Sequence, residues 1–179
     1  MEEEASVIPA PKLGWMAGII DLKGRLVYKH NKQRATPQVV LLVETKEYAI
    51  IRQLGVLTGT KAEFKKAQPL KDFMRRGCSD HCPEAHVHVG DDRIMPQSAR
   101  WTITGAGMVV VLTNLKPYLT IDRGYSEAIE QVGAVTTLEG QGSGMVMVSL
   151  QRLQSLDWEL PPEYAQALRD HLGEVPTDE

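Results

Sequence analysis

The sequence predicts an α+β fold, because extended and helical patterns follow one another along the chain without a repeat of solenoid length. Residues 38–45, QVVLLVET, are rich in the β-branched and aliphatic residues typical of strands. Apolar residues recur at every third position in residues 46–58, which indicates a helix. With 179 residues, of which 42% are hydrophobic, the chain can bury a sizeable core.

The first half of the chain is predicted to hold a helix, two strands and a second helix. Residues 13–24 are predicted as the first helix, with small residues that let another backbone approach closely and with Gly24 as a left-handed stop. Residues 25–34 are predicted as a strand with a cationic outer face, and a turn at Thr36-Pro37 leads into the strand at 38–45. The helix at 46–58 follows.

The second half is predicted to begin with another hairpin. Its strands would be residues 100–104, RWTIT, and residues 108–114, MVVVLTN, joined through Gly105-Ala-Gly107. The remaining expected elements are a helix at 126–132, a strand at 145–150 after a flexible glycine-rich turn, and a helix from Pro161-Pro162 to residue 172.

Charge is distributed unevenly along the chain. The net charge of −3 and the pI of about 6.0 argue by themselves against nucleic-acid binding. However, the tails hold six acids and no base, whereas residues 12–76 hold 14 Lys or Arg against five acids. Such a local excess can attract phosphates. The alternative is a solvated basic face that binds nothing.

Residues 16–24, MAGIIDLKG, resemble the signature of the LAGLIDADG homing endonucleases. Ala17, Gly18, Asp21 and Gly24 are identical to the signature, and the other apolar positions are equivalent. A basic hairpin, a helix and a second hairpin follow in the family's order, and the segment NLKPYL at 114–119 is similar to the one after the family's second hairpin. The resemblance covers roughly residues 12–132 without the cysteine region. It implies a LAGLIDADG-like αββαββα fold.

The resemblance further implies a homodimer that binds double-stranded DNA. In the family, two signature helices pack on each other through their small residues, and the sheets lie over the major groove, where strand side chains reach base edges. Because this chain has one signature, two copies would join through the helix at 13–24 and act on a partly symmetric site. The alternative for the motif is an ordinary buried helix. The basic residues expected to contact DNA are Lys23, Arg25, Lys29, Lys32, Arg34 and Arg123.

Lys23 departs from the family's pattern. In the family this position holds an acid that binds the catalytic metal, and metal-assisted hydrolysis of phosphodiesters needs carboxylate oxygens to hold the ion. An ammonium group would repel Mg²⁺ and pair with a phosphate. We therefore expect a regulatory or architectural DNA-binding protein that has lost cleavage. The alternatives are an active Mg²⁺-dependent endonuclease that uses Asp21 or Asp122, and a protein-interaction module that no longer binds DNA.

Residues 77–88, GCSDHCPEAHVH, gather both cysteines and three of the five histidines of the chain. Thiolates and imidazoles in sets of four are the ligands of structural zinc. We expect zinc to be bound by Cys78, Cys82, His86 and His88, with His81 as the alternative fourth ligand. The other interpretations are a reduced cysteine pair beside surface histidines, and a Cys/His nucleophile, for which no hydrolase signature is present.

The expected organisation has four parts. They are a disordered acidic arm at 1–11, a LAGLIDADG-like domain at 12–135 with a Cys/His insertion at about 72–98, a strand-and-helix extension at 136–172, and an acidic tail at 173–179. The apolar run at 108–112 is too short to cross a bilayer, no signal segment opens the sequence, and two nearby cysteines fit a reducing compartment. We expect a cytoplasmic protein without a membrane partner, associated with the nucleoid when it binds DNA.

Overall fold

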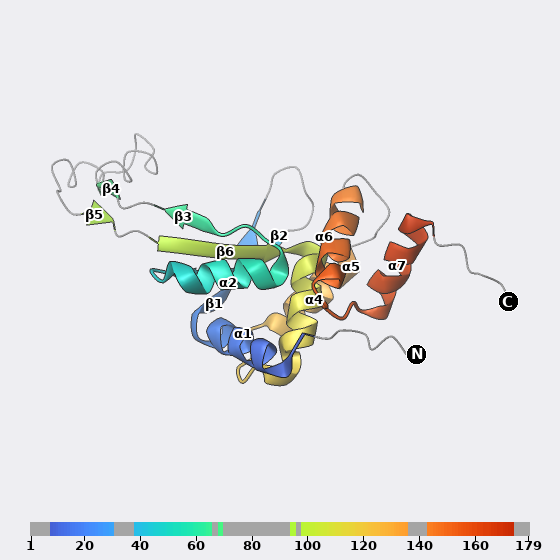
Figure 1. The fold of residues 1–179 in the computed structure, drawn as a ribbon, viewed down its shortest axis with the longest axis horizontal. Coiled ribbons are helices and arrows are strands. Elements are labelled where there is room, and N and C mark those ends of the chain that lie inside the picture. Colours follow the sequence, from blue (N-terminus) through green and yellow to red (C-terminus); the bar gives the residue numbers. More distant parts are fainter. Residues whose placement is uncertain are drawn as a thin grey trace.

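Helices and strands follow one another in the computed structural model, which describes residues 8–30, 38–65, 68–69, 94–95, 98–135 and 143–173 (Figure 1). The elements are α1 (Ala10–Lys23), β1 (Gly24–Lys29), β2 (Gln38–Thr45), α2 (Tyr48–Thr58), β3 (Glu63–Lys65), β4 (Gln68–Pro69), β5 (Ile94–Met95), β6 (Ser98–Thr104), α4 (Gly105–Leu115), the 3-10 helix η2 (Lys116–Tyr118), α5 (Tyr125–Val135), α6 (Ser143–Ser155) and α7 (Pro162–Leu172). The predicted α+β class is confirmed.

Four strands form an antiparallel sheet in the order β1-β2-β6-β3, and β4 pairs with β5 in a second, two-stranded sheet. The first hairpin, β1 with β2, was predicted from the sequence. The second hairpin is β3 with β6, and residues 66–97 lie between its two strands. The predicted Cys/His insertion falls in this interval, and most of it lies outside the described residues.

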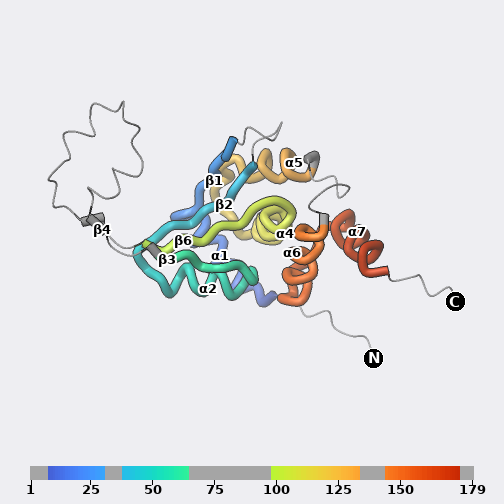
Figure 2. Tube along the Cα trace, turned by 90° about the horizontal axis from the view of Figure 1, so that it is seen from above, coloured from blue at the N-terminus to red at the C-terminus, as the bar shows by residue number. Residues whose placement is uncertain are grey.

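The helices cover one face of the four-stranded sheet. Along β2, Val39, Leu41 and Val43 share a core with residues of α1, α2 and α4. Val40 and Leu42 alternate with them and therefore point to the other face. No described helix lies on that other face, as the views in Figures 1 and 2 show. One face of the sheet thus builds the core, and none of the described helices covers the other.

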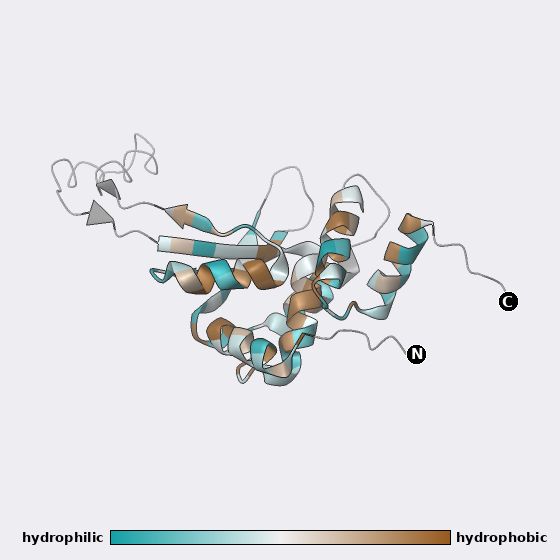
Figure 3. Ribbon diagram, in the orientation of Figure 1, coloured by the Kyte–Doolittle hydropathy of each residue, from teal (hydrophilic) through white to brown (hydrophobic). Residues whose placement is uncertain are grey.

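The predicted strand at 108–114 is wrong, because this segment belongs to helix α4. Eight of the eleven residues of α4 are buried. The helix packs against the sheet, α1, η2, α5 and α6, and Figure 3 shows its hydrophobic residues at the centre of the molecule. A run that is apolar on every side has neither the period of a strand nor that of a surface helix, so burial decides its conformation. Gly105, at φ +58, ends β6 and lets the chain turn into the helix.

The predicted strand at 145–150 is also wrong, because this segment belongs to helix α6. Met147, Leu150 and Leu153 are buried at a spacing of three, whereas Met145 and Val148 are exposed. The apolar residues of MVMVSL conceal this helical period, because both exposed positions are themselves apolar. The C-terminal extension therefore consists of the two helices α6 and α7.

The C-terminal extension is held against the end of α2 by two side chains. The indole N–H of Trp158 donates to the carbonyl oxygen of Leu57 at 2.7 Å, and the Arg152 guanidinium donates to that of Gly59 at 2.9 Å. The last carbonyls of a helix have no partner within the helix, so these bonds satisfy groups that α2 leaves open. The N-terminal segment also reaches this region, since Ile8 is buried and its N–H donates to the carbonyl of Asp157 at 3.4 Å.

Gly24 differs from its predicted conformation. It is extended, with φ −72 and ψ 142, and it begins β1 directly after α1 rather than forming a left-handed stop. Its requirement is space, because a Cβ at this position would lie 2.5 Å from the carbonyl oxygen of Ile20. Glycine therefore allows α1 to run straight into the sheet.

We expect Gly24→Ala to lower the free energy of unfolding by about 1–3 kcal/mol, because the added methyl group must displace backbone. Urea denaturation at neutral pH measures the change. Gly133→Ala is the matched control: Gly133 lies in α5, where a Cβ would meet no atom within 4 Å. Alanine there should raise the stability by about 0.5–1 kcal/mol. Equal effects of the two substitutions would contradict the steric argument.

Candidate nucleic-acid interface

Asp21 joins the end of α1 to the loop that precedes α5. Its side chain is buried, with 7% of the residue exposed. Its Oδ2 accepts hydrogen bonds from the backbone N–H of Thr120 at 2.8 Å and from the Thr120 hydroxyl at 2.7 Å. The Tyr125 hydroxyl donates to the carbonyl of Ile20 at 3.4 Å beside it. These contacts place Asp21 in a structural position, where its carboxylate is turned into the protein.

The carboxylate of Asp21 is ionised at neutral pH. Burial opposes its charge, but the two hydrogen bonds from Thr120, the N–H of Ile121 and the positive charge of Arg123 outweigh that cost. The pKa of Asp21 therefore lies below its usual value. Burial also opposes the charged form of Tyr125, and here it prevails: the pKa of Tyr125 is raised, so its hydroxyl stays protonated.

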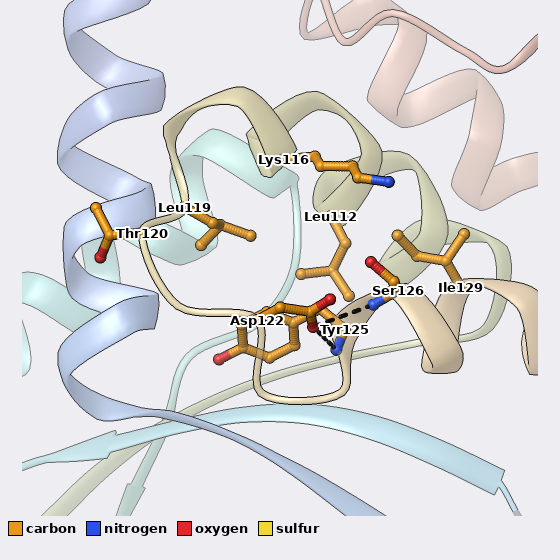
Figure 4. Close-up of a pocket in the computed structure, with 8 residues that line it drawn as sticks. All are labelled: Leu112, Lys116, Leu119, Thr120, Asp122, Tyr125, Ser126 and Ile129. Atoms are coloured by element: carbon orange, nitrogen blue, oxygen red, sulfur yellow. Dashed lines mark hydrogen bonds between the residues drawn. The ribbon is translucent and has the colours of Figure 1, made fainter.

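Asp122 caps the N-terminus of α5. Its Oδ1 accepts from the N–H of Tyr125 at 2.8 Å and from that of Ser126 at 3.4 Å, as Figure 4 shows. The Ser126 side chain is the main cause that lowers the pKa of this carboxyl group. A cavity of about 250 Å³ lies beside the cap, with Leu112, Leu119 and Ile129 in its wall. The second acid suggested for metal chemistry is thus engaged in a helix cap.

Lys23 lies two residues after Asp21 but on a different side of α1. Residues two positions apart do not share a helix face, so Lys23 is exposed while Asp21 is buried. The ammonium group lies in the last turn of α1, where a positive charge complements the helix dipole. It also lies directly before β1, so it borders the sheet.

The uncovered face of the four-stranded sheet is called the open face here. Strand alternation and the pairing register place its residues on one side of the sheet. They are Arg25, Val27 and Lys29 of β1, Gln38, Val40, Leu42 and Glu44 of β2, Glu63 of β3, and Ser98, Arg100, Thr102 and Thr104 of β6. Val40 and Leu42 are buried, whereas Arg25, Lys29 and Gln38 are exposed.

Glu44 connects three strands across the open face. Its Oε2 accepts from Arg25 Nη2 at 3.3 Å and from Arg100 Nη2 at 3.2 Å, and its Oε1 accepts from the Ser98 hydroxyl at 3.1 Å. The Arg25 side chain is 62% exposed and that of Arg100 is 28% exposed. The Arg25 guanidinium is therefore accessible, whereas that of Arg100 is partly buried, with its Nε enclosed and without a hydrogen-bond partner among the described residues. One carboxylate orients both groups.

Glu44 and Arg100 are not among the contact residues predicted from the sequence. Glu44 ends an apolar strand and Arg100 begins another, 56 residues later. The alternation of Arg100, Thr102 and Thr104 around the buried Trp101 was a signal that β6 has a polar face. The pairing of Glu44 with Arg100 depends on β2 lying next to β6, which the misplaced second hairpin hid.

The predicted DNA contacts lie in several places. Arg25 and Lys29 lie on the open face, Lys23 at its border, and Arg123 is exposed in the loop before α5. Lys32 and Arg34 lie outside the described residues. So do the predicted zinc ligands Cys78, Cys82, His86 and His88, together with His81. Within the described residues, no group of three or more His, Cys, Asp or Glu could hold a metal ion.

Helix α1 is apolar on its outward face as well as on its buried one. Lys12, Asp21 and Lys23 are its only charged residues, and Leu22 is 77% exposed. At Gly18 an added Cβ would meet no atom within 4 Å, so another backbone could approach there. An exposed apolar stripe on a helix is a surface that a partner can cover. The outward face of α1 consists of Pro11, Gly14, Trp15, Gly18, Ile19 and Leu22, of which Trp15 and Ile19 also pack against the core.

Within the part of the chain that the structure describes, no helix is long and apolar enough to span a bilayer.

No family model and no curated protein matches this chain. Among solved structures, it is similar to the homing endonuclease I-CvuI in complex with its target, with a TM-score of 0.46 and 14% identity over 92% of this chain and 96% of that chain. The archaeal intron-encoded homing endonuclease I-Vdi141I, complexed with DNA, has a TM-score of 0.45 and 9% identity over 88% of this chain and 92% of its own.

The I-LtrWI LAGLIDADG homing endonuclease bound to target DNA has a TM-score of 0.40 and 13% identity, and the match covers 94% of this chain but 51% of that one. Identities of 9–14% with TM-scores of 0.40–0.46 do not assign the chain to a family.

We expect Asp21→Asn to destabilise the protein by about 1–2 kcal/mol at pH 7, because the charged acceptor of the two Thr120 hydrogen bonds is lost. The folded-state pKa of Asp21 is lowered, so its contribution is complete above the unfolded-state pKa of about 3.9 and is lost as the pH falls through the folded-state value. Urea denaturation of both proteins from pH 7 to pH 3 should therefore show the difference shrinking below about pH 4.

Thr120→Val is the control for this series. It removes the hydroxyl donor and keeps the backbone N–H bond, so we expect a smaller loss than for Asp21→Asn. A difference between wild type and Asp21→Asn that persists undiminished at pH 3 would contradict an ionised Asp21.

Proposed function

We propose that this chain is a homodimeric protein that binds double-stranded DNA through the open face and does not cleave it, in a regulatory or architectural role. The observation that carries the proposal is a four-stranded antiparallel sheet with one face free of described helices and with exposed cations along its first strand. The order α1-β1-β2-α2-β3-β6-α4 matches the αββαββα order of the LAGLIDADG family, and the signature-like residues 16–24 join α1 to β1.

Strand side chains suit contact with duplex DNA. The major groove admits a β-ribbon, and exposed Arg or Lys side chains on such strands can reach phosphates or base edges. Arg25 and Lys29 project from β1 at alternate positions on one side, and Lys23 precedes them at the border of the sheet. This arrangement gives the protein a line of cations along one edge of the open face.

The homodimer is supported by the outward face of α1. This face is apolar and is open at Gly18, where an added Cβ would meet no atom within 4 Å, so a second α1 could approach it closely. Because α1 runs directly into β1, an edge strand of the sheet, such pairing would bring the two open faces next to each other. An isologous contact of this kind matches a partly symmetric DNA site.

Loss of cleavage is supported by the state of the nearby acids. Asp21 faces inward to Thr120, Asp122 caps α5, and the exposed position next to Gly24 carries Lys23. A hard divalent cation needs exposed carboxylate oxygens. We further propose that zinc, bound by Cys78, Cys82, His86 and His88, stabilises the insertion between β3 and β6.

A protein-interaction module is the second candidate function. The observation that favours it is Glu44, which offsets the charge of two of the cations on the open face. Salt-dependent DNA affinity separates the two functions, because neutralisation of phosphates by Lys and Arg makes binding weaken with salt.

We expect the wild-type protein to bind random duplex DNA at low salt, with an affinity that falls as salt rises. Lys29→Ala should make the slope of log affinity against log salt less steep by about one per protomer, because one phosphate contact is lost. Fluorescence anisotropy with a labelled duplex measures both quantities. Arg169→Ala is the control, since Arg169 is exposed on α7, which lies at the other end of the molecule from the sheet (Figure 1).

The same duplex, incubated with the protein and Mg²⁺, tests cleavage. Intact strands are expected. Strand scission that is lost in Asp21→Asn would instead support an active endonuclease. If the protein does not bind the duplex at low salt, the result would contradict the DNA-binding function and favour the interaction module.

Dimerisation through α1 predicts that Leu22→Glu produces a folded monomer. Leu22 is 77% exposed, so the substitution leaves the core intact but places a charge in the apolar interface. Sedimentation equilibrium measures the mass. Val56→Glu is the matched control, because Val56 is 66% exposed on α2 and lies outside the proposed interface. A wild-type monomer at all concentrations, or a Leu22→Glu dimer, would contradict the assignment.

A further inference from the structure

We propose that Glu44 is a specificity-determining residue of the open face, which holds Arg25 and Arg100 for contact with base edges and keeps them from contacting phosphates. This inference rests on the proposed DNA-binding function and goes beyond it, because it divides the cations of the open face by their targets.

The geometry places one member of the cluster on each of three neighbouring strands. Glu44 lies on the inner strand β2, directly opposite Arg100 of β6 in the pairing register. Arg25 of β1 is paired with Leu42 and is therefore a diagonal neighbour of Glu44. One carboxylate oxygen binds both guanidinium groups, at 3.3 and 3.2 Å, and the other is held by Ser98 at 3.1 Å. The three hydrogen bonds fix the carboxylate and, through it, both arginines.

The cluster leaves the exposed guanidinium of Arg25 and the terminal nitrogens of Arg100 able to donate further, whereas the Nε of Arg100 is buried. A guanidinium group has five N–H donors, and Nη2 of each arginine donates to Glu44. Two parallel donors are what the O6 and N7 atoms of guanine accept in the major groove. With 62% of its side chain exposed, Arg25 is accessible to such a partner. The chemistry therefore suits guanine bases on the DNA surface that the sheet covers.

The Glu44 carboxylate lowers the net positive charge that Arg25 and Arg100 present to a phosphate. A phosphate attracts net positive charge, and Glu44 offsets that charge at a distance of about 3 Å. Lys29 lies at the end of β1, outside this cluster, and keeps the role of a phosphate contact. Phosphate contacts position a protein on DNA without reading its sequence. Because Glu44 weakens phosphate contacts at Arg25 and Arg100, it favours discrimination between DNA sequences.

A merely structural ion pair would behave differently. The Arg25 bond is exposed and the Arg100 bond is partly buried, so a purely structural role predicts a change in stability but none in DNA discrimination when Glu44 is replaced. Glu63 provides a matched control. It lies directly opposite Arg100 on the other neighbouring strand, is exposed, and carries the same charge, but the Arg100 bond goes to Glu44.

The test begins with selection of a preferred duplex from a random pool by the wild-type protein. The affinities for this duplex and for a scrambled duplex are then measured across salt concentrations. For Glu44→Gln, we expect tighter binding to the scrambled duplex, a salt slope steeper by about two per protomer as two arginines gain phosphate contacts, and a loss of discrimination of about tenfold. Glu63→Gln removes the same charge from the same face, so it should tighten binding to both duplexes alike and should not lower the discrimination.

Arg25→Ala provides a second readout that does not depend on the folding of Glu44→Gln. We expect it to lower discrimination by about tenfold with the salt slope unchanged, because a base contact is lost. A slope less steep by about one, with discrimination retained, would identify Arg25 as a phosphate contact and overturn the inference.

The outcomes separate the two proposals. If the wild-type protein does not bind duplex DNA at low salt, the proposed function fails and this inference fails with it. If the wild-type protein binds with steep salt dependence, but Glu44→Gln and Glu63→Gln behave alike, the proposed function stands and the role of Glu44 is rejected.

Discussion

The burial of α4 is the constraint on which the rest of the structure depends. Its valines, methionine and leucines contact the sheet on one side and α1, α5 and α6 on the others. Removal of such a continuous apolar surface from water is the largest favourable contribution available to a chain of this size. Helix α1 and strands β2 and β6 of the candidate interface contact α4 directly, and β1 and β3 pair with β2 and β6. The open face is therefore supported by the buried core.

The fold was partly predictable, and the failures have a physical cause. Residues 38–45 and 46–58 were identified because one shows β-branched residues in a run and the other shows apolar residues at a helical spacing. The runs at 108–114 and 145–150 were misread because a helix buried all round, or one with apolar residues on its exposed side, has no visible period. Local sequence patterns predicted elements that show their own period. They could not predict which other elements would pack against α4 and α6, and this packing decides the conformation of those two segments.

Some residues of the candidate site could be predicted from the sequence and others could not. Cations before and along β1 could be identified from the sequence, since Lys23, Arg25 and Lys29 follow the signature-like segment directly. Glu44 and Arg100 could not, because their significance arises only when β2 pairs with β6. The burial of Asp21 likewise depends on Thr120, which is far away in the sequence. Long-range pairing thus decides which charged residues are available to a partner.

The division of the second hairpin by residues 66–97 has a consequence for folding and solubility. Pairing of β3 with β6 brings together segments that residues 66–97 separate, and the three pairs of β3 with β6 and the two pairs of β4 with β5 together offset the entropic cost of that closure. Because β3 forms three pairs and each of the other pairings in the main sheet has six, we expect β3 to open most readily. When it opens, the longer strand β6 presents unpaired backbone groups, which are a template for strands of other chains. The short strand β3 therefore protects β6 against edge-to-edge aggregation.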